Sequence, residues 1–382
     1  MTTDGNPGTS DIELSDSRDE LVGRIRVRRA LPRKGLRTVG AWCFADHMGP
    51  ALVTEDAGLD VGPHPHTGLQ TVTWIVQGQV LHRDSLGSEQ VIAPGQLNLM
   101  TAGWGVSHSE EATGRYAGPL HGIQLWIAQP EASRFGAAAF EHHATLPAVA
   151  LGAATGGGGA GEATVLVGEL DGVASPARHD TPLVGAELRL TGAAEVPLRA
   201  DWQYGLVVLE GAVRLDGDDE PVGPGRLAHL RPGRSAIECG SCAGERGAAA
   251  RVMLLGGEPF TETLLMWWNY VARTRAEVDA AHTRGTPTTV GSAPWPALCP
   301  AYRAVRRSGR RPAADRASPR ARGATPLVPN PPNRCELRTG FLHSLQVCLS
   351  CRHADGAAGA EEAGDDGGAG HRGAPAHARP GP

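Results

Sequence analysis

The sequence Gly-Pro-His-Pro-His-Thr-Gly at residues 62–68 decides the interpretation of this chain, together with His-Ser-Glu at residues 108–110. In an extended strand successive side chains alternate between faces, so His64 and His66 point the same way. Pro65 favours extended backbone at the preceding residue, and it indicates a strand start or an edge strand. The histidine and the glutamate of the second stretch also share one face.

These two stretches together predict a metal site. A single His-Pro-His could be a turn with two solvated imidazoles, but two strands lying side by side would bring four side chains to one point: His64, His66, His108 and Glu110. Three neutral imidazoles and a carboxylate can close a tetrahedral zinc site or leave two positions open on an octahedral metal. The ligand set suits iron, nickel, copper, zinc and manganese, so it does not select the metal.

The segment between the two stretches has the pattern of short antiparallel strands. Residues 71–76 (Thr-Val-Thr-Trp-Ile-Val) are β-branched and aromatic, and Gln77-Gly78 then turns the chain. Further turns are indicated at residues 84–87 and at Pro94-Gly95. This spacing predicts an antiparallel sandwich or a small barrel, in whose interior ligands from distant strands can meet.

The ligand pattern resembles the first metal-binding module of the pirin family, within the cupin superfamily of double-stranded β-helix barrels. The ordinary cupin pattern has a glutamate ligand a few residues after His-x-His, but Gln70 holds that place here. The pirin variant takes its acidic ligand two residues after the third histidine, as in His108-Ser109-Glu110. The resemblance therefore implies that His64, His66, His108 and Glu110 bind one divalent metal, Fe(II). It covers roughly residues 23–284, with further pirin-like pieces at residues 39–47, 121–126 and 266–273.

The resemblance implies an iron-dependent dioxygenase, an oxidoreductase of the quercetin 2,3-dioxygenase type. Its substrates would be O2 and a flavonol or a similar aromatic enol, with Glu110 as both metal ligand and catalytic base. The alternative is a metal- or redox-sensing regulator that binds a protein partner, and a third option is a purely structural metal. A pocket open to solvent favours catalysis, whereas a closed site beneath a flat charged face favours the regulator.

We expect an all-β chain of two tandem cupin barrels with a few short helices. Residues 1–22 are polar and are expected to be a disordered leader. The metal-binding barrel is expected at 23–145 and a second, metal-free barrel at 146–284, because the second segment has neither His-x-His nor His-x-Glu. His229 is interpreted as an ordinary barrel histidine. Helical character is expected at 131–145 and 275–284.

The last segment, residues 285–382, is expected to be a tail without a function. Residues 303–322 are arginine-rich and lack stacking aromatic side chains, apart from Tyr302 just before them, which argues against a nucleic-acid-binding arm. Disorder is one interpretation. Another is a frameshifted translation of GC-rich DNA, because pirin-like sequence stops abruptly there and Lys34 is the only lysine in the chain.

Composition sets broad limits. The 382 residues suggest two domains, and 41% hydrophobic residues suffice for packed cores. A net charge of −5 gives no reason to expect nucleic acid or a membrane as a partner. With no apolar run near the ~20 residues of a spanning helix, we expect a cytoplasmic protein. Seven scattered cysteines argue against a disulfide framework, and we interpret the two Cys-x-x-Cys pairs (239/242 and 348/351) as chance.

Three polar residues outside the ligand set could hydrogen-bond the ligand histidines: Asp46, His82 and His121. The competing interpretation places the two histidines as ordinary barrel or loop residues. Trp74, Trp104 and Trp126 are expected in the core, although Trp104, which lies between two glycines, could line a pocket mouth.

Overall fold

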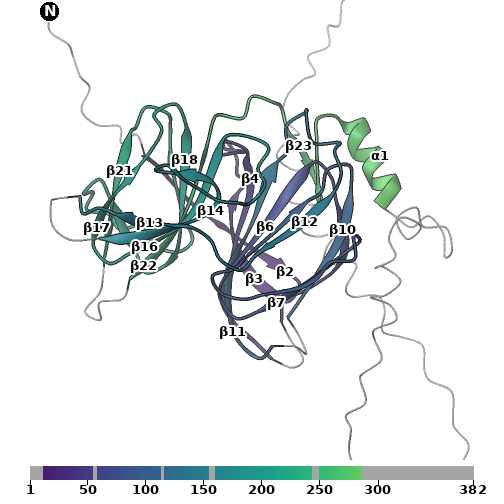
Figure 1. The fold of residues 1–382 in the computed structure, drawn as a ribbon, viewed down its shortest axis with the longest axis horizontal. Coiled ribbons are helices and arrows are strands. Elements are labelled where there is room, and N and C mark those ends of the chain that lie inside the picture. Colours follow the sequence, from purple (N-terminus) through teal and green to yellow (C-terminus); the bar gives the residue numbers. More distant parts are fainter. Residues whose placement is uncertain (1–11, 55–57, 113–115, 155–159, 243–248, 286–382) are drawn as a thin grey trace, which may run out of the picture.

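The chain forms two β-barrels packed side by side, with one α-helix on the outside of the first (Figure 1). The computed structural model describes residues 12–54, 58–112, 116–154, 160–242 and 249–285. The expectation of an all-β chain with two barrels is confirmed. The segment 286–382, where the tail was expected, and the cysteine pair 348/351 lie outside the described residues.

The first barrel is built from two sheets. The larger has the strand order β12-β9-β6-β11-β4-β3-β2, and the smaller has the order β5-β10-β7-β8. The strands are β2 (Arg18–Val22), β3 (Ile25–Leu31), β4 (Trp42–Val53), β5 (Asp60–His66), β6 (Leu69–Gln77), β7 (Val80–Asp84), β8 (Glu89–Ile92), β9 (Leu97–Thr101), β10 (Val106–Glu111), β11 (Gly118–Ala128) and β12 (Ala139–His143).

The second barrel repeats this arrangement. Its larger sheet has the order β1-β20-β18-β22-β16-β14-β13, with β15 paired to β14, and its smaller sheet has the order β17-β21-β19. The strands are β1 (Ile12–Asp16), β13 (Ala148–Leu151), β14 (Gly161–Leu170), β15 (Val173–Ala174), β16 (Leu183–Leu190), β17 (Ala193–Pro197), β18 (Gln203–Glu210), β19 (Val213–Leu215), β20 (Arg226–Leu230), β21 (Ala236–Ser241) and β22 (Ala250–Gly257).

After β22 the chain returns to the first barrel. We call residues 262–285 the C-terminal strap. It contains β23 (Leu265–Trp267), β24 (Tyr270–Ala272) and helix α1 (Arg275–Gly285), which confirms the expected helix at 275–284. Thr67, directly after β5, forms a parallel bridge with Tyr270, and the Val271 amide donates to the Thr67 carbonyl oxygen. The strap therefore lies against the end of the strand that carries His64 and His66.

Two expectations for local structure are corrected. Part of the expected leader is ordered: β1 pairs with β20 of the second barrel, where Ile12 and Leu14 pack against the core, and β2 pairs with β3. Ile12 and Leu14 stand among polar residues in the sequence, so the pattern indicates the strand β1 only weakly. The expected helix at 131–145 is a turn that ends at Gly136, followed by β12, which pairs with β9.

A shared hydrophobic cluster joins the two barrels around Trp42. This side chain is fully buried, and its indole N–H lies 3.0 Å from the Val184 carbonyl oxygen and 3.2 Å from that of Gly256. Position 185 must be glycine, because a Cβ there would lie 2.7 Å from the Trp42 ring. One aromatic side chain of the first barrel thus docks on the backbone of the second.

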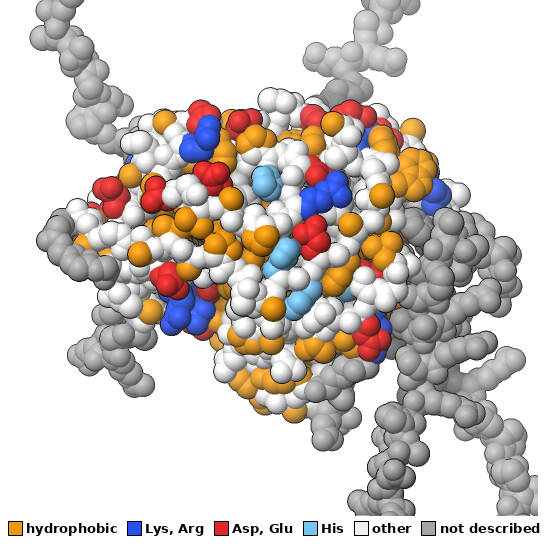
Figure 2. Space-filling model, viewed as in Figure 1, with side chains coloured by type: hydrophobic (Ala, Val, Ile, Leu, Met, Phe, Trp, Pro, Cys, Tyr) orange, Lys and Arg blue, Asp and Glu red, His pale blue; other side chains and the backbone are white. Residues whose placement is uncertain are grey.

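The surface carries no dominant charge on the face seen in Figure 2. Acidic and basic side chains are interspersed with hydrophobic ones, and histidine side chains reach the surface near the middle of that face. Among the described residues, no helix has the length and apolar character needed to cross a membrane.

We expect Trp42→Ala to lower the free energy of unfolding by about 3–5 kcal/mol, because it opens a cavity between the barrels. Trp104→Ala is the matched control, since its side chain is 52% exposed, and its loss should cost about 1 kcal/mol or less. Urea unfolding followed by circular dichroism measures both. Equal losses in the two variants would contradict the role given to Trp42.

Candidate metal centre

The antiparallel pairing of β5 with β10 creates the candidate site. In this register His64 lies opposite His108, and His66 lies opposite Val106. β5 is an edge strand of its sheet, as Pro65 predicts, so the proline ring disrupts no inner ladder. The strand pairing expected from the two quoted stretches is present.

Three imidazoles meet on one side of this strand pair. Ring nitrogens of His64, His66 and His108 all lie within 4.8 Å of one another, and Nε2 of His66 is 3.0 Å from Nε2 of His108. His66 and His108 are buried, whereas His64 is partly exposed.

The outer nitrogens of two of these rings have hydrogen-bond acceptors. Nδ1 of His64 lies 2.8 Å from the Gly62 carbonyl oxygen, and Nδ1 of His66 lies 3.0 Å from that of Asn269 in the strap. A carbonyl oxygen only accepts, so each Nδ1 carries the proton and each Nε2 presents a lone pair to the centre. This is the arrangement that a histidine metal ligand needs.

The spacing of the nitrogens also fits a metal. Two nitrogens bound to one metal at about 2.1 Å lie about 3.0 Å apart when the bonds meet at a right angle, and the His66–His108 distance is 3.0 Å. Burial lowers the pKa of His64 to about 4 and those of His66 and His108 well below their usual range. All three are therefore neutral near pH 7, which is the form that binds metal.

Glu110 lies close to this group but is not one of the three residues whose ligand atoms lie within 4.8 Å of one another. A β-bulge falls between His108 and Glu110 in the pairing with β5. Glu110 belongs to a second group, with His82 and His108, whose ligand atoms also lie within 4.8 Å of one another. Its Oε1 accepts from the Thr73 hydroxyl at 3.2 Å. Burial raises the pKa of Glu110, and a bound cation would lower it again because it stabilises the carboxylate.

The other polar residues singled out from the sequence have different surroundings. His82 touches a ligand histidine: its Nδ1 lies 3.3 Å from Nδ1 of His108. Asp46 instead forms a buried two-pronged ion pair with Arg29, at 2.8 Å for both contacts. His121 pairs with His47 at 2.8 Å and with Glu210 of the second barrel, so it joins the barrels.

Gln70 and the three tryptophans singled out from the sequence lie outside the group of histidines. Gln70, which stands where other cupins have glutamate, donates to the Thr101 hydroxyl at 3.0 Å and to the Arg178 carbonyl oxygen. The expectation of Trp104 in the core is wrong: its side chain is 52% exposed, and it lines a groove of about 310 Å³ together with Phe135 and, from α1, Ala276. The other two tryptophans, Trp74 and Trp126, are buried as expected.

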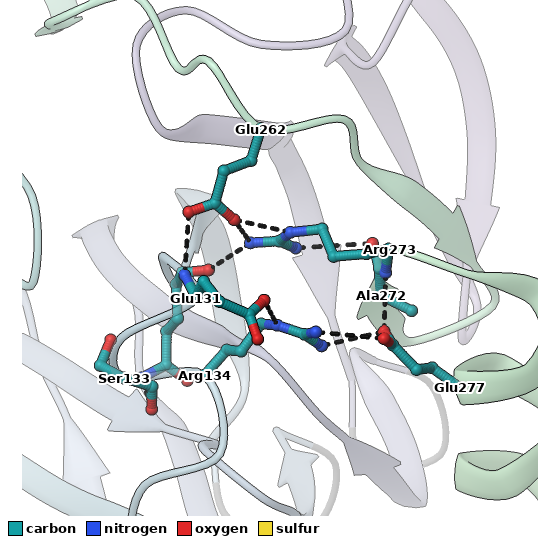
Figure 3. A network of polar contacts seen from close by, with 8 residues as sticks. Glu131, Ser133, Arg134, Glu262, Ala272, Arg273 and Glu277 are labelled. Atoms are coloured by element: carbon teal, nitrogen blue, oxygen red, sulfur yellow. Dashed lines mark hydrogen bonds and ion pairs between the residues drawn. The ribbon is translucent and has the colours of Figure 1, made fainter.

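Sequence reasoning missed the ion pairs that hold the strap in place. Arg273 binds Glu262 and donates to the Gln129 carbonyl oxygen at 2.8 Å, while Arg134 makes two contacts with Glu277 at 2.9 and 3.1 Å (Figure 3). These contacts join the strap to the loop after β11. They fix the backbone that carries the Asn269 carbonyl. The Asn269 carbonyl oxygen belongs to the backbone, so the residue type at that position does not indicate its role. The pirin-like segment 266–273 was the sequence feature that indicated this region.

Comparisons with known proteins place this chain in one family. The family model described as Pirin matches residues 24–127, and the model described as Pirin C-terminal cupin domain matches residues 184–284. A Pseudomonas aeruginosa protein with the provisional name quercetin 2,3-dioxygenase is 45% identical, over 69% of this chain and 79% of its own length. A pirin-like protein of Caulobacter vibrioides is 34% identical, over 70% of this chain and 90% of its own.

Solved structures show the same fold. A crystal structure of quercetin 2,3-dioxygenase from Acinetobacter baumannii is 39% identical, with a TM-score of 0.65, over 74% of this chain and 93% of that one. A bacterial pirin from Escherichia coli, solved with nickel(II), is 18% identical with a TM-score of 0.50, over 65% of this chain and 99% of that one. One family model matches residues in the first barrel and the other in the second, and the Pseudomonas aeruginosa relative is 45% identical over 79% of its length. The chain therefore belongs to the pirin family.

Proposed function

We propose that this chain is a mononuclear iron-dependent dioxygenase of the quercetin 2,3-dioxygenase type, acting on flavonol-like enols. The observation that carries the proposal is the convergence of three neutral imidazoles beside a buried carboxylate on two paired strands. The provisional name of the Pseudomonas aeruginosa relative and the Acinetobacter baumannii structure, a quercetin 2,3-dioxygenase, support the choice of reaction.

Four side chains would hold the metal: His64, His66, His108 and Glu110. The metal, when bound, would supply Lewis-acid stabilisation of an enolate and a redox path to O2. Fe(II) is our proposal for its identity, because a site of imidazoles and one carboxylate with open positions suits iron oxygenases.

Glu110 would also act as the base that removes the hydroxyl proton of the enol. Its carboxylate is buried and accepts a hydrogen bond from the Thr73 hydroxyl, and a bound cation would keep it ionised and able to take up a proton. Substrate would approach past His64, the partly exposed member of the ligand set. Buried neighbours on the other sides would exclude water from the reacting atoms.

We expect the protein, purified without metal and loaded anaerobically, to bind one Fe(II) per chain. His66→Ala should weaken binding at least about tenfold, because it removes a ligand with a preset lone pair. His229→Leu is the matched control, since it removes a buried histidine of the second barrel. Metal analysis after dialysis against graded chelator concentrations gives the affinities. Equal binding by His66→Ala and the parent chain would show that the ligand assignment is wrong.

We expect the Fe(II)-loaded protein to consume one O2 and release one CO for each quercetin. Glu110→Gln should lower kcat by about 10²-fold or more, because the amide cannot take up the proton. Glu111→Gln is the control: its neighbouring carboxylate pairs with Arg83 instead. An oxygen electrode and a CO assay measure the reaction. Bound iron without O2 uptake, combined with a redox-dependent change in partner binding, would favour the metal- or redox-sensing regulator.

A further inference from the structure

A buried histidine and a buried aspartate lie directly behind His108. Nδ1 of His82 is 3.3 Å from Nδ1 of His108, and Nε2 of His82 is 3.2 Å from Oδ2 of Asp84. The His82 ring stacks on Phe140 with ring centroids 4.5 Å apart, which fixes the plane of the imidazole. All three polar side chains are at most 3% exposed. The proposed function assigns no role to His82 or Asp84.

The direction of each hydrogen bond follows from Asp84. Its Oδ1 accepts from the backbone N–H groups of Leu86 and Ser88, both at 2.9 Å, so this carboxylate is anchored in the turn after β7. Its Oδ2 is then an acceptor for His82, and His82 carries its proton on Nε2. Nδ1 of His82 is left with a lone pair.

The tautomer of His108 follows from that of His82. Because Nδ1 of His82 accepts, Nδ1 of His108 must donate, and the Nε2 of His108 is left with a lone pair. That lone pair faces the lone pair on Nε2 of His66 across 3.0 Å. Two lone pairs at this distance repel each other unless a cation lies between them, so the arrangement is built for a metal.

We propose that His82 and Asp84 are positioning residues: they hold His108 in the tautomer that offers its Nε2 lone pair to the metal. The inference rests on the metal centre of the proposed function, but not on its dioxygenase activity. His64 and His66 obtain the same tautomer from backbone carbonyl oxygens. His108 obtains it from the Asp84 carboxylate through two hydrogen bonds, by way of His82. This carboxylate also makes the His108 imidazole a stronger electron-pair donor to a metal.

A competing arrangement makes His82 a metal ligand itself, since His82, His108 and Glu110 form the second group of closely spaced ligand atoms. In that arrangement Nδ1 of both histidines would bind a metal, and Nε2 of His108 would remain for another. A single metal in that arrangement would need neither His64 nor His66, whereas the metal of the proposed function needs both. Co(II) binding by His66→Ala therefore separates the two arrangements.

Asp84→Asn tests the proposal with little disturbance to the fold. The single amide oxygen should keep the two bonds from Leu86 and Ser88, which turns the amide N–H₂ group toward His82. His82 would then accept at Nε2 and carry its proton on Nδ1, and His108 would in turn carry its proton on Nε2. The variant thus reverses the tautomer of a ligand without removing one.

We expect two measurable consequences in the full-length protein. In the metal-free protein labelled with ¹⁵N-histidine, long-range ¹H–¹⁵N spectra should show His108 protonated on Nδ1, and on Nε2 in Asp84→Asn. Co(II) affinity should fall about 10- to 100-fold in Asp84→Asn. In a His82→Leu background Asp84→Asn should change Co(II) affinity less than about twofold, because the hydrogen-bond chain from Asp84 to His108 is already broken. Glu111→Gln, which removes a neighbouring carboxylate of β10, should leave both readouts unchanged.

An unchanged His108 tautomer in Asp84→Asn, or a Co(II) affinity within about twofold of the parent chain, would overturn the proposal. A Co(II) ion that His66→Ala binds as tightly as the parent chain, and that His82→Leu does not bind, would overturn it in favour of His82 as a ligand. Because neither readout uses a flavonol, a protein that passes both tests and never consumes O2 would refute only the dioxygenase.

Discussion

The pairing of β5 with β10 is the constraint on which the metal centre depends. Side chains alternate along a strand, so a slip of one residue would turn every ligand of one strand away from those of the other. β5 is an edge strand, with a neighbour on one side within its own sheet. Its register is held at both ends: the Ala112 amide donates to the Leu59 carbonyl oxygen at 2.8 Å, and the Val271 amide donates to that of Thr67 at 3.0 Å.

This arrangement gives the C-terminal half of the chain a part in the site. The second barrel docks on the first through Trp42, and the strap then returns to place the Asn269 carbonyl oxygen against His66. Arg273 and Arg134 clamp the strap through Glu262 and Glu277 (Figure 3). The His66 side chain is thus oriented by backbone about two hundred residues later in the chain.

The sequence predicted those features that depend on residue type and spacing. Alternating β-branched residues indicated the strands, and the i, i+2 spacing brought His64, His66 and His108 together. The expected helix at 131–145 was wrong because helix-forming residues there are overridden by pairing with β9. The Asn269 contact and the bulge beside Glu110 could not be predicted, since both are properties of the backbone. His82 was singled out, but its link to Asp84 requires the β7 turn to be folded.

The most direct test of the metal centre is anomalous X-ray diffraction from crystals of the Fe(II)-loaded protein, with data on both sides of the iron absorption edge. We expect one iron peak per chain, about 2.1 Å from Nε2 of His64, His66 and His108 and within bonding distance of a Glu110 oxygen. A peak bound by Nδ1 of His82 and His108, or none on the β5–β10 pair, would contradict this expectation.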